Sequence, residues 1–206
     1  MTPLPPRLSS SCFALLCVKI ATVSDATSCK RVLELGCGRK KTPGAIGVDI
    51  NSDATAADVI CGLNRGLPFA DNTFECVRAV QVIGHLDSVM ASIAEMPRVT
   101  RPGGSIYLVT PHYADYSSWC DPTHHWRLNS FSSYFFGRHH GERHWYTRLE
   151  LRQIALHVEL ARLWKRMGIE FLVNRFVWFR RFWEMYLCFV VRGKQMEFAF
   201  EVIKQS

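Results

Sequence analysis

Residues 32–38 read Val32-Leu33-Glu34-Leu35-Gly36-Cys37-Gly38, an apolar run that ends in Gly-x-Gly. Such a short run predicts a buried strand, and the glycines allow the backbone to turn sharply where the strand ends. The next apolar run, residues 45–50, carries Asp49 near its end. Because open parallel sheets bind ligands at the carboxyl ends of their strands, this acid can accept hydrogen bonds from ribose hydroxyls there.

The segments on either side of this run predict the rest of a sheet. We expect strands at residues 57–60, 74–80 and 105–110, a helix at 88–100 and a turn at 101–104. Apolar and polar residues alternate over 148–160 and 195–204, which is typical of two antiparallel strands at a sheet edge. The predicted fold class is therefore α/β, a doubly wound, mostly parallel sheet with an antiparallel C-terminal edge.

The connection between the first two strands is unusually short. Seven residues, 39–45, follow Gly38 before the next strand, whereas a right-handed crossover needs about ten or more. The usual first crossover helix must be absent or a single turn. We expect a helix over residues 11–22 to cover that face instead, and we prefer this interpretation to a signal peptide because the apolar run 11–18 is short.

The totals indicate one domain of 206 residues, 48% of them hydrophobic. We divide it into an extension at 1–24, a cofactor-binding core at 30–112, and a substrate-side region at 113–206. The net charge of +7 suits an anionic partner or simple solubility, but no basic run is long enough for a nucleic-acid arm. Eight cysteines without C-x-x-C spacing predict a reduced, cytoplasmic protein without a structural zinc site.

Four motifs together resemble the class I S-adenosylmethionine-dependent methyltransferase family. In order they are Leu33–Gly38, Gly47-Val48-Asp49, Leu67-Pro68-Phe69 with Phe74-Glu75, and Arg98–Gly104. Each motif is weak alone, whereas their order and spacing over residues 30–112 are specific. The resemblance implies a methyltransferase with a Rossmann-like fold and S-adenosyl-L-methionine as its cofactor.

The resemblance also implies roles for individual residues. Gly36, Cys37 and Gly38 would lie against the methionine part of the cofactor, Glu34 would orient that loop or meet the amino group, and Asp49 would hold the ribose. Near the adenine we expect either Asp58 or the turn that contains Leu63. On the side of the methyl group we expect Gln81 and Val82.

Three positions depart from the family pattern. Lys40 replaces the third glycine of the first motif, Gly62 stands where an Asp often precedes Leu63, and the common Leu-Glu-His reads Ile83-Gly84-His85. These departures leave open a non-catalytic interaction protein that keeps the fold. An RNA methyltransferase is a further alternative, disfavoured because the chain has no separate RNA-binding module and no Asn/Asp-Pro-Pro-Tyr motif.

Residues 110–126 carry the predicted acceptor side. This segment resembles a Pro-His…Asp-Pro-Thr-His stretch of a bacterial subset of these methyltransferases. Methyl transfer to a hydroxyl needs a base, so His112 and His124 are the candidate bases and Asp121 the orienting acid. The candidate substrate-binding residues are Tyr113, Tyr116, Trp119 and Trp126. A divalent metal held by His112, Asp121, His124 and His125 is a weaker alternative, and we predict no metal.

The sequence predicts methyl transfer to a small molecule or sugar, most simply to oxygen, by a monomer or homodimer. We expect neither nucleic acid as a partner nor a transmembrane segment. Residues 171–191 interleave aromatics with arginines, which fits a helix packed on the sheet, a lid or dimer contact, RNA binding, or a peripheral surface for a lipid-linked or anionic substrate.

Overall fold

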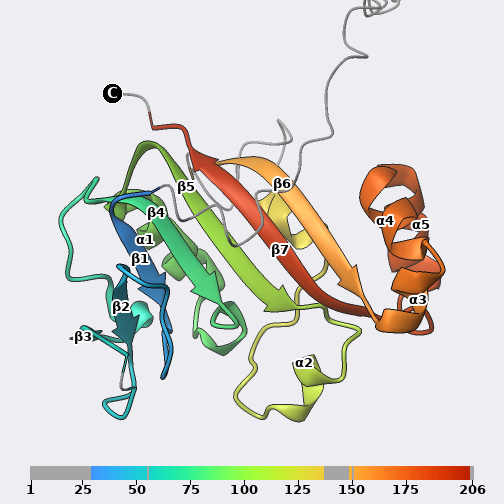
Figure 1. Ribbon diagram of the computed structural model, residues 1–206, viewed down its shortest axis with the longest axis horizontal. Coiled ribbons are helices and arrows are strands. Elements are labelled where there is room, and N and C mark those ends of the chain that lie inside the picture. Colours follow the sequence, from blue (N-terminus) through green and yellow to red (C-terminus); the bar gives the residue numbers. More distant parts are fainter. Residues whose placement is uncertain (1–28, 55, 137–148, 150, 205–206) are drawn as a thin grey trace, which may run out of the picture.

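A seven-stranded mixed sheet organises the chain in the computed structural model, which describes residues 29–54, 56–136, 149 and 151–204 (Figure 1). The strands are β1 (Val32–Leu35), β2 (Ile46–Asp49), β3 (Val59–Ile60), β4 (Phe74–Val80), β5 (Thr100–Pro111), β6 (Leu151–Leu160) and β7 (Gly193–Val202). The helices are α1 (Val89–Val99), α2 (Ser117–Cys120), α3 (Arg162–Arg166), α4 (Ile169–Arg175) and α5 (Val177–Tyr186), with 3-10 turns η3 (Leu63–Arg65), η4 (Ile83–His85) and η5 (Ser132–Phe135).

The strand order is β3-β2-β1-β4-β5-β7-β6. The first five strands pair in parallel, β7 runs antiparallel to β5, and β6 runs antiparallel to β7. This arrangement confirms the predicted fold class and its antiparallel C-terminal edge. It also places the residues after β1, β2, β3, β4 and β5 along one edge of the sheet, where ligands bind in folds of this kind.

The predicted turn at 101–104 is wrong as a separate element. Phe74 pairs with Thr100 and Cys76 pairs with Ser105. Residues 101–104 therefore form a bulge inside a longer β5. Gly103 adopts a positive φ of 71° there. A glycine-containing bulge lets a strand bend without ending, which the Pro-Gly-Gly composition alone does not distinguish from a turn.

The short connection from β1 to β2 contains no helix among its residues, 36–45, as the spacing predicted. The helix expected over 11–22 and the extension 1–24 lie outside the described residues. Within the residues that the structure describes, no helix is both long enough and apolar enough to span a membrane.

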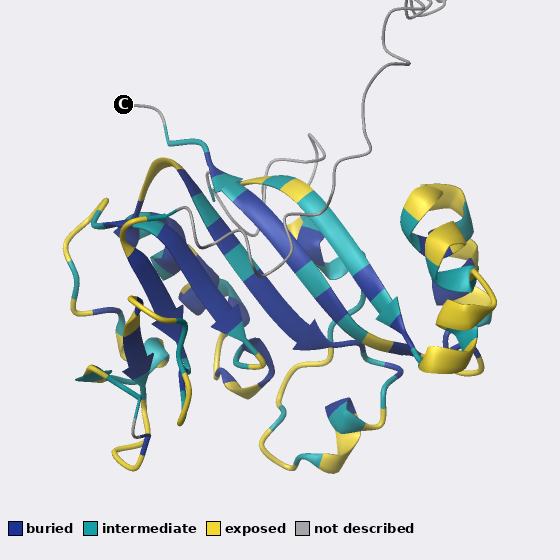
Figure 2. Ribbon diagram, viewed as in Figure 1, coloured by how far each residue is buried: buried dark blue, intermediate teal, exposed yellow. Residues whose placement is uncertain are grey.

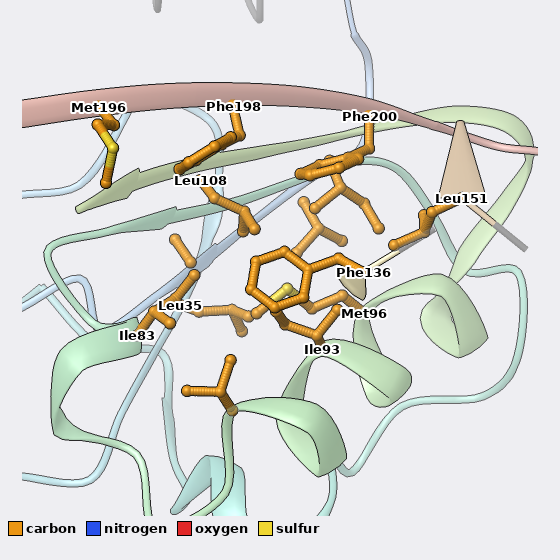
Figure 3. Packing of buried hydrophobic residues seen from close by; sticks show 14 of the residues in the cluster. Leu35, Ile83, Ile93, Met96, Leu108, Phe136, Leu151, Met196, Phe198 and Phe200 are labelled. Carbon is orange, nitrogen blue, oxygen red and sulfur yellow. The ribbon is translucent and has the colours of Figure 1, made fainter. Parts of the chain in front are cut away.

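The main hydrophobic core lies between the sheet and α1 (Figures 2 and 3). Alternate strand residues point into it, including Leu35 of β1 and Met196, Phe198 and Phe200 of β7. Ile93 and Met96, three residues apart on α1, meet them from the other side. Because every second strand residue is committed to this face, the register of the sheet is fixed by burial.

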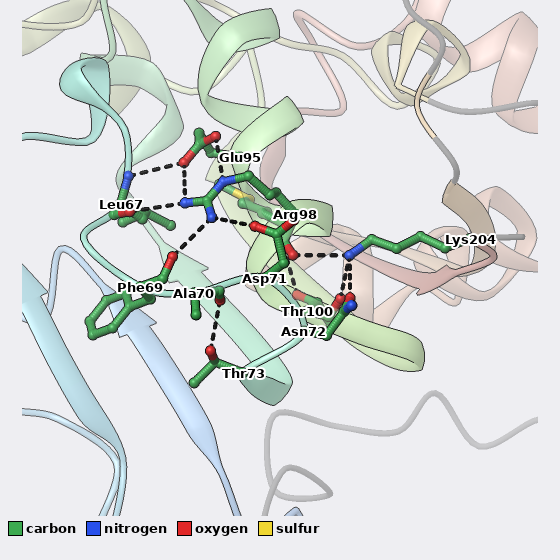
Figure 4. Close-up of polar contacts among 11 residues, drawn as sticks. Leu67, Phe69, Ala70, Asp71, Asn72, Thr73, Glu95, Arg98, Thr100 and Lys204 are labelled. Atoms are coloured by element: carbon green, nitrogen blue, oxygen red, sulfur yellow. Dashed lines mark hydrogen bonds and ion pairs between the residues drawn. The ribbon is translucent and has the colours of Figure 1, made fainter. Parts of the chain in front are cut away.

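Arg98, near the end of α1, ties residues 67–71 to the helix (Figure 4). Its guanidinium donates to the Leu67 and Phe69 carbonyls at 2.9 Å each, to Asp71 at 2.7 Å and to Glu95 at 2.8 Å. The Arg98 hydrogen bonds, and then its charge, lower the pKa of Glu95 although burial opposes the shift. These contacts join the Leu67-Pro68-Phe69 motif to the motif that begins at Arg98, and together the two motifs hold the loop before β4.

The helical layer α3–α5 packs beside the edge strand β6, which confirms that residues 161–191 are partly helical (Figure 1). Asn174 of α4 accepts from the Val158 N–H at 2.8 Å and donates to its carbonyl at 2.9 Å. Glu170 accepts from the Leu160 N–H at 3.0 Å. Side chains of α4 thus satisfy backbone groups that an edge strand would otherwise present to solvent.

Candidate active site

The loop after β1 is shaped by two glycines with positive φ, Gly36 at 64° and Gly38 at 56°. A Cβ on Gly36 would lie 2.2 Å from Val82 Cγ2, so this position also needs glycine for packing against the loop after β4. A Cβ on Gly38 would have no atom within 4 Å. The backbone at Gly38 therefore faces open space in which a ligand can approach it closely.

Asp49, the last residue of β2, organises this corner. One carboxylate oxygen accepts from the Gly38 N–H at 2.8 Å and the other from the Asn51 N–H at 2.9 Å. Each carboxylate oxygen can accept a further hydrogen bond. The side chain that fixes the glycine loop is thus also able to accept from ribose hydroxyls, as the sequence analysis predicts.

Glu34 lies in the middle of β1 and is buried. Its carboxylate accepts from the Thr42 N–H at 2.6 Å and lies 3.9 Å from the Arg78 guanidinium. These contacts hold the far end of the loop 36–45. Of the two roles predicted for Glu34, the geometry supports orienting the loop.

Asp58 does not lie where an adenine-binding residue would. It precedes β3, at the amino end of the strand, and accepts from the Gly47 N–H at 2.7 Å and from Lys41. The Gly47 hydrogen bond and then Lys41 lower its pKa. The alternative, the turn that contains Leu63, follows β3 at the ligand-binding edge. The adenine prediction for Asp58 is therefore corrected in favour of the Leu63 turn, because only the latter reaches that edge.

Gln81 and Val82 follow β4 at the same edge. Gln81 adopts a positive φ of 58°, which is uncommon for a residue with a side chain, and its N–H donates to the Val109 carbonyl at 2.8 Å. Val82 packs against Gly36, as described above. Strained backbone of this kind is concentrated at functional sites, and here it directs the chain after β4 toward the glycine loop.

His112, a candidate base, is fully buried at the end of β5. Its Nδ1 accepts from the Ala114 N–H at 3.2 Å, and its Nε2 lies 3.3 Å from Glu184 of α5. The Trp183 ring packs against the imidazole at a tilt of 40°, with centroids 5.0 Å apart. Both nitrogens are engaged and the ring does not reach solvent, so the geometry favours an anchoring role for His112 over the predicted base.

Glu184 receives a second hydrogen bond, from the Ser130 N–H at 2.8 Å. Burial raises the pKa of Glu184, but the hydrogen bond and charge of His112 and the bonds from Ser130 outweigh it, so the pKa lies below its usual value. An ionised carboxylate thus joins α5, β5 and the loop after α2 in the interior.

The predicted substrate-binding aromatics lie on the loop that follows β5. Tyr113 is partly buried against α5, its hydroxyl donating to the Glu184 carbonyl at 3.2 Å, and burial raises its pKa. Tyr116, Trp119 and Trp126 are exposed. The Trp119 indole donates to the Tyr113 carbonyl at 2.7 Å, and the Trp126 indole donates to the Leu86 carbonyl at 2.7 Å. Three of the four rings are therefore available to an acceptor.

Asp121, Thr123 and His85 form a hydrogen-bonded chain. The Thr123 hydroxyl and N–H both donate to Asp121, at 2.6 and 2.9 Å, and these bonds lower the pKa of Asp121. His85 Nδ1 lies 2.8 Å from the same hydroxyl oxygen. Because the only hydroxyl proton of Thr123 points to the carboxylate, its oxygen must accept from Nδ1–H. In the neutral imidazole, Nε2 of His85 then carries the free lone pair.

His124 packs on this chain. Its ring lies 4.3 Å from the ring of His85, centroid to centroid, and its Nδ1 is buried without a partner in the structure. A Cβ on Gly84 would lie 2.7 Å from His124 Cδ2. The departure from Leu-Glu-His to Ile83-Gly84-His85 therefore has a structural cause, since a side chain at 84 would displace His124.

His85, Asp121 and His124 could also hold a metal ion, because one ligand atom from each lies within 4.8 Å of the others. Asp121 and His85 are already joined through the Thr123 hydroxyl, which engages Oδ1 of the acid and Nδ1 of the imidazole. The arrangement suits a hydrogen-bonded base better than a metal centre.

Sequence reasoning missed His85, Thr123 and Glu184. The first two lie inside quoted motifs, so a signal was present, but only the fold brings the loop after β4 to the loop after β5. Glu184 had no local signal, since its partner His112 is 72 residues away in the sequence.

Comparison with known proteins agrees with this fold. Residues 33–108 match the family model described as a methyltransferase domain. An uncharacterized methyltransferase of Schizosaccharomyces pombe is 50% identical over 40 residues, which are 19% of this chain and 14% of that protein. A demethylmenaquinone methyltransferase of Corynebacterium urealyticum is 44% identical over 48 residues, 23% of this chain and 21% of that protein.

The solved structure of a SAM-dependent methyltransferase from Archaeoglobus fulgidus superposes with a TM-score of 0.56 at 16% identity, covering 87% of this chain and 89% of that one. The chain therefore has the fold of S-adenosylmethionine-dependent methyltransferases, and its residues 33–108 are similar to the methyltransferase-domain model. The sequence matches span about a fifth or less of the two curated relatives.

Proposed function

We propose that this chain transfers a methyl group from S-adenosylmethionine to a small-molecule or sugar acceptor. The observation that carries the proposal is the pairing of Asp49 with the open backbone at Gly38. An acid at the end of β2 fixes a glycine loop and keeps acceptor capacity for a ribose. The space above Gly38, which a Cβ would fill, fits the methionine part of the cofactor.

When bound, S-adenosylmethionine supplies a methyl group attached to a sulfonium sulfur, and this sulfur keeps the electron pair of the carbon–sulfur bond that breaks. The chain must then position the acceptor in line with that bond and remove the acceptor proton. The loop after β4 suits this task, since Val82 contacts the glycine loop and the His85 N–H donates to the Val82 carbonyl at 3.0 Å.

His85 is the base that the geometry supports best. The acceptor oxygen forms its bond to the methyl carbon while its proton passes to the free Nε2 of His85. Thr123 and Asp121 hold the ring in the tautomer that leaves Nε2 unprotonated, and the Asp121 carboxylate stabilises the imidazolium that forms. Asp121 thus keeps its predicted orienting role, acting on His85 through Thr123, and His124 supports the ring by packing.

The exposed aromatics Tyr116, Trp119 and Trp126 favour a ring-shaped acceptor such as a sugar or a phenol. The name of the Corynebacterium relative adds a quinol as a second acceptor class. A phenolic or quinol hydroxyl also loses its proton before methylation at oxygen or at the adjacent carbon, so the same base serves both outcomes.

The test is transfer of labelled methyl groups to a panel of sugars, phenols and quinols. His85→Asn retains a donor near Nδ1 and removes Nε2, so we expect turnover to fall by about 10²–10⁴-fold with cofactor affinity unchanged. His125→Asn, at an exposed histidine of the loop after β5, is the matched control and should keep its turnover. Equal turnover of His85→Asn and the unsubstituted protein would contradict the assignment.

A further inference from the structure

The helical layer α3–α5 exposes an unusual amount of apolar surface. Twelve of the twenty exposed large hydrophobic residues of the described chain fall within residues 163–190. Trp178 is 70% exposed, Tyr186 68% and Phe189 66%. Contiguous exposure of this kind marks an interaction surface, because scattered single residues would not gather on three consecutive helices.

The spacing on α5 defines one continuous face. We call it the α5 outer face, made of Trp178, Phe182, Met185 and Tyr186 of α5 together with Phe189 and Val190 of the turn that follows it. Its rings follow one another along the helix, with centroids of Phe182 and Tyr186 5.3 Å apart. The opposite face of α5 is buried through Trp183 and Cys188. A surface helix normally carries polar residues on its outer side. The fold buries only the inner face of α5, so the apolar outer face is not needed for packing.

The charged residues around this face are positive. Arg162, Arg166, Arg175, Arg181 and Arg192 are all exposed. The acids between residues 161 and 192 are two glutamates that do not balance them: Glu184 is buried against His112, and Glu170 lies 3.4 Å from Lys165. The exposed charge beside the α5 outer face is therefore cationic.

We propose that the α5 outer face docks the protein on an anionic lipid bilayer. Tryptophan and tyrosine favour the headgroup level, where the ring meets hydrocarbon and the polar atom meets water. Arginines beside such a face attract anionic headgroups, and their long side chains reach the phosphate layer. A nucleic acid would use the cations but leave the aliphatic residues Met185 and Val190 in water, which makes the bilayer the better match.

The docked face would adjoin the acceptor side of the site. Phe189, in the turn after α5, contacts the Tyr113 ring with centroids 5.4 Å apart, and Glu184 of α5 binds His112. An amphiphilic acceptor could then pass from the bilayer surface to the loop after β5 without crossing bulk water. This consequence rests on the proposed function, whereas the docking does not.

Flotation of the full chain with vesicles tests the docking. We expect binding to phosphatidylcholine vesicles with about 30% phosphatidylserine, weakening as salt rises, and little binding to phosphatidylcholine alone. Arg175→Glu with Arg181→Glu should lower the affinity at least about 25-fold, at about fivefold for each cation removed. Lys30→Glu with Arg65→Glu makes the same charge change on the β1–β3 side of the sheet and should lower it far less.

The apolar part is tested by Trp178→Ser, which should weaken binding by about tenfold, with Trp178→Phe as the control that retains most of it. These residues are exposed, so a thermal melt should show each variant folded as the unsubstituted protein is. Absence of binding to the anionic vesicles would overturn the proposal, and a segment or partner protein that covers the face would produce that result. Equal losses in the Arg175/Arg181 and Lys30/Arg65 variants would overturn it too. Because no cofactor or acceptor is present, failure here leaves the proposed methyl transfer untouched.

Discussion

The cofactor corner after β1 and β2 and the acceptor corner after β4 and β5 are built in different ways. In the cofactor corner, the Asp49 carboxylate accepts from nearby backbone, from Gly38 eleven residues away and from Asn51 two residues away in the sequence. In the acceptor corner, side chains meet across long separations, 38 residues for His85 and Thr123 and 72 for His112 and Glu184. The first corner is local and follows from its own motif, whereas the second exists only when the whole fold is formed.

The substitution with the largest expected effect on stability is at Gly36, in the cofactor corner. Gly36→Ala adds a Cβ 2.2 Å from Val82 at a positive φ, and we expect a loss of about 3 kcal/mol of unfolding free energy from strain and overpacking together. Gly38→Ala has the same backbone strain but open space, so about 1–2 kcal/mol is expected together with loss of cofactor binding. Urea denaturation of both variants measures the difference, and equal losses would show that Val82 does not press on Gly36.

A second variant pair examines the acceptor corner at Gly84. Gly84→Ala should cost about 1–3 kcal/mol because the new Cβ meets the His124 ring. In the background of His124→Ala the same change should cost much less, since the ring is gone. A double-mutant cycle of unfolding free energies gives the coupling, and additive effects would contradict the packing of His124 over Gly84.

The smallest expected effect concerns Glu184. Its pKa is lowered in the folded state, so its stabilisation is present above the ordinary glutamate pKa and is lost as pH falls through the folded value. Glu184→Gln keeps an acceptor oxygen and removes only the charge, so it should lower the free energy of unfolding by about 1 kcal/mol at pH 7, with the difference shrinking below about pH 4. Melting curves of both proteins against pH test this, and a constant difference would mean that Glu184 is not ionised in the fold.

The same contrast explains what the sequence could predict. The five parallel strands, the missing crossover helix and the position of Asp49 at the end of β2 all depend on residues close together in the chain. Asp58 was misplaced because the predicted strand over residues 57–60 contained it, whereas β3 begins at Val59 and leaves Asp58 before its amino end. His112 was predicted as a base because no residue near it in the sequence indicates its contact with Glu184. His85 was overlooked because its partner Thr123 lies on another loop.

Calorimetric titration with S-adenosylmethionine tests the central claim, that the corner at Asp49 binds this cofactor. The unsubstituted protein should bind, and Asp49→Asn should bind about 10–100-fold more weakly because charge-assisted hydrogen bonds are lost. Asp58→Asn, the same change at an acid before β3, should bind as the unsubstituted protein does. No binding by the unsubstituted protein, or equal weakening by both substitutions, would contradict the account.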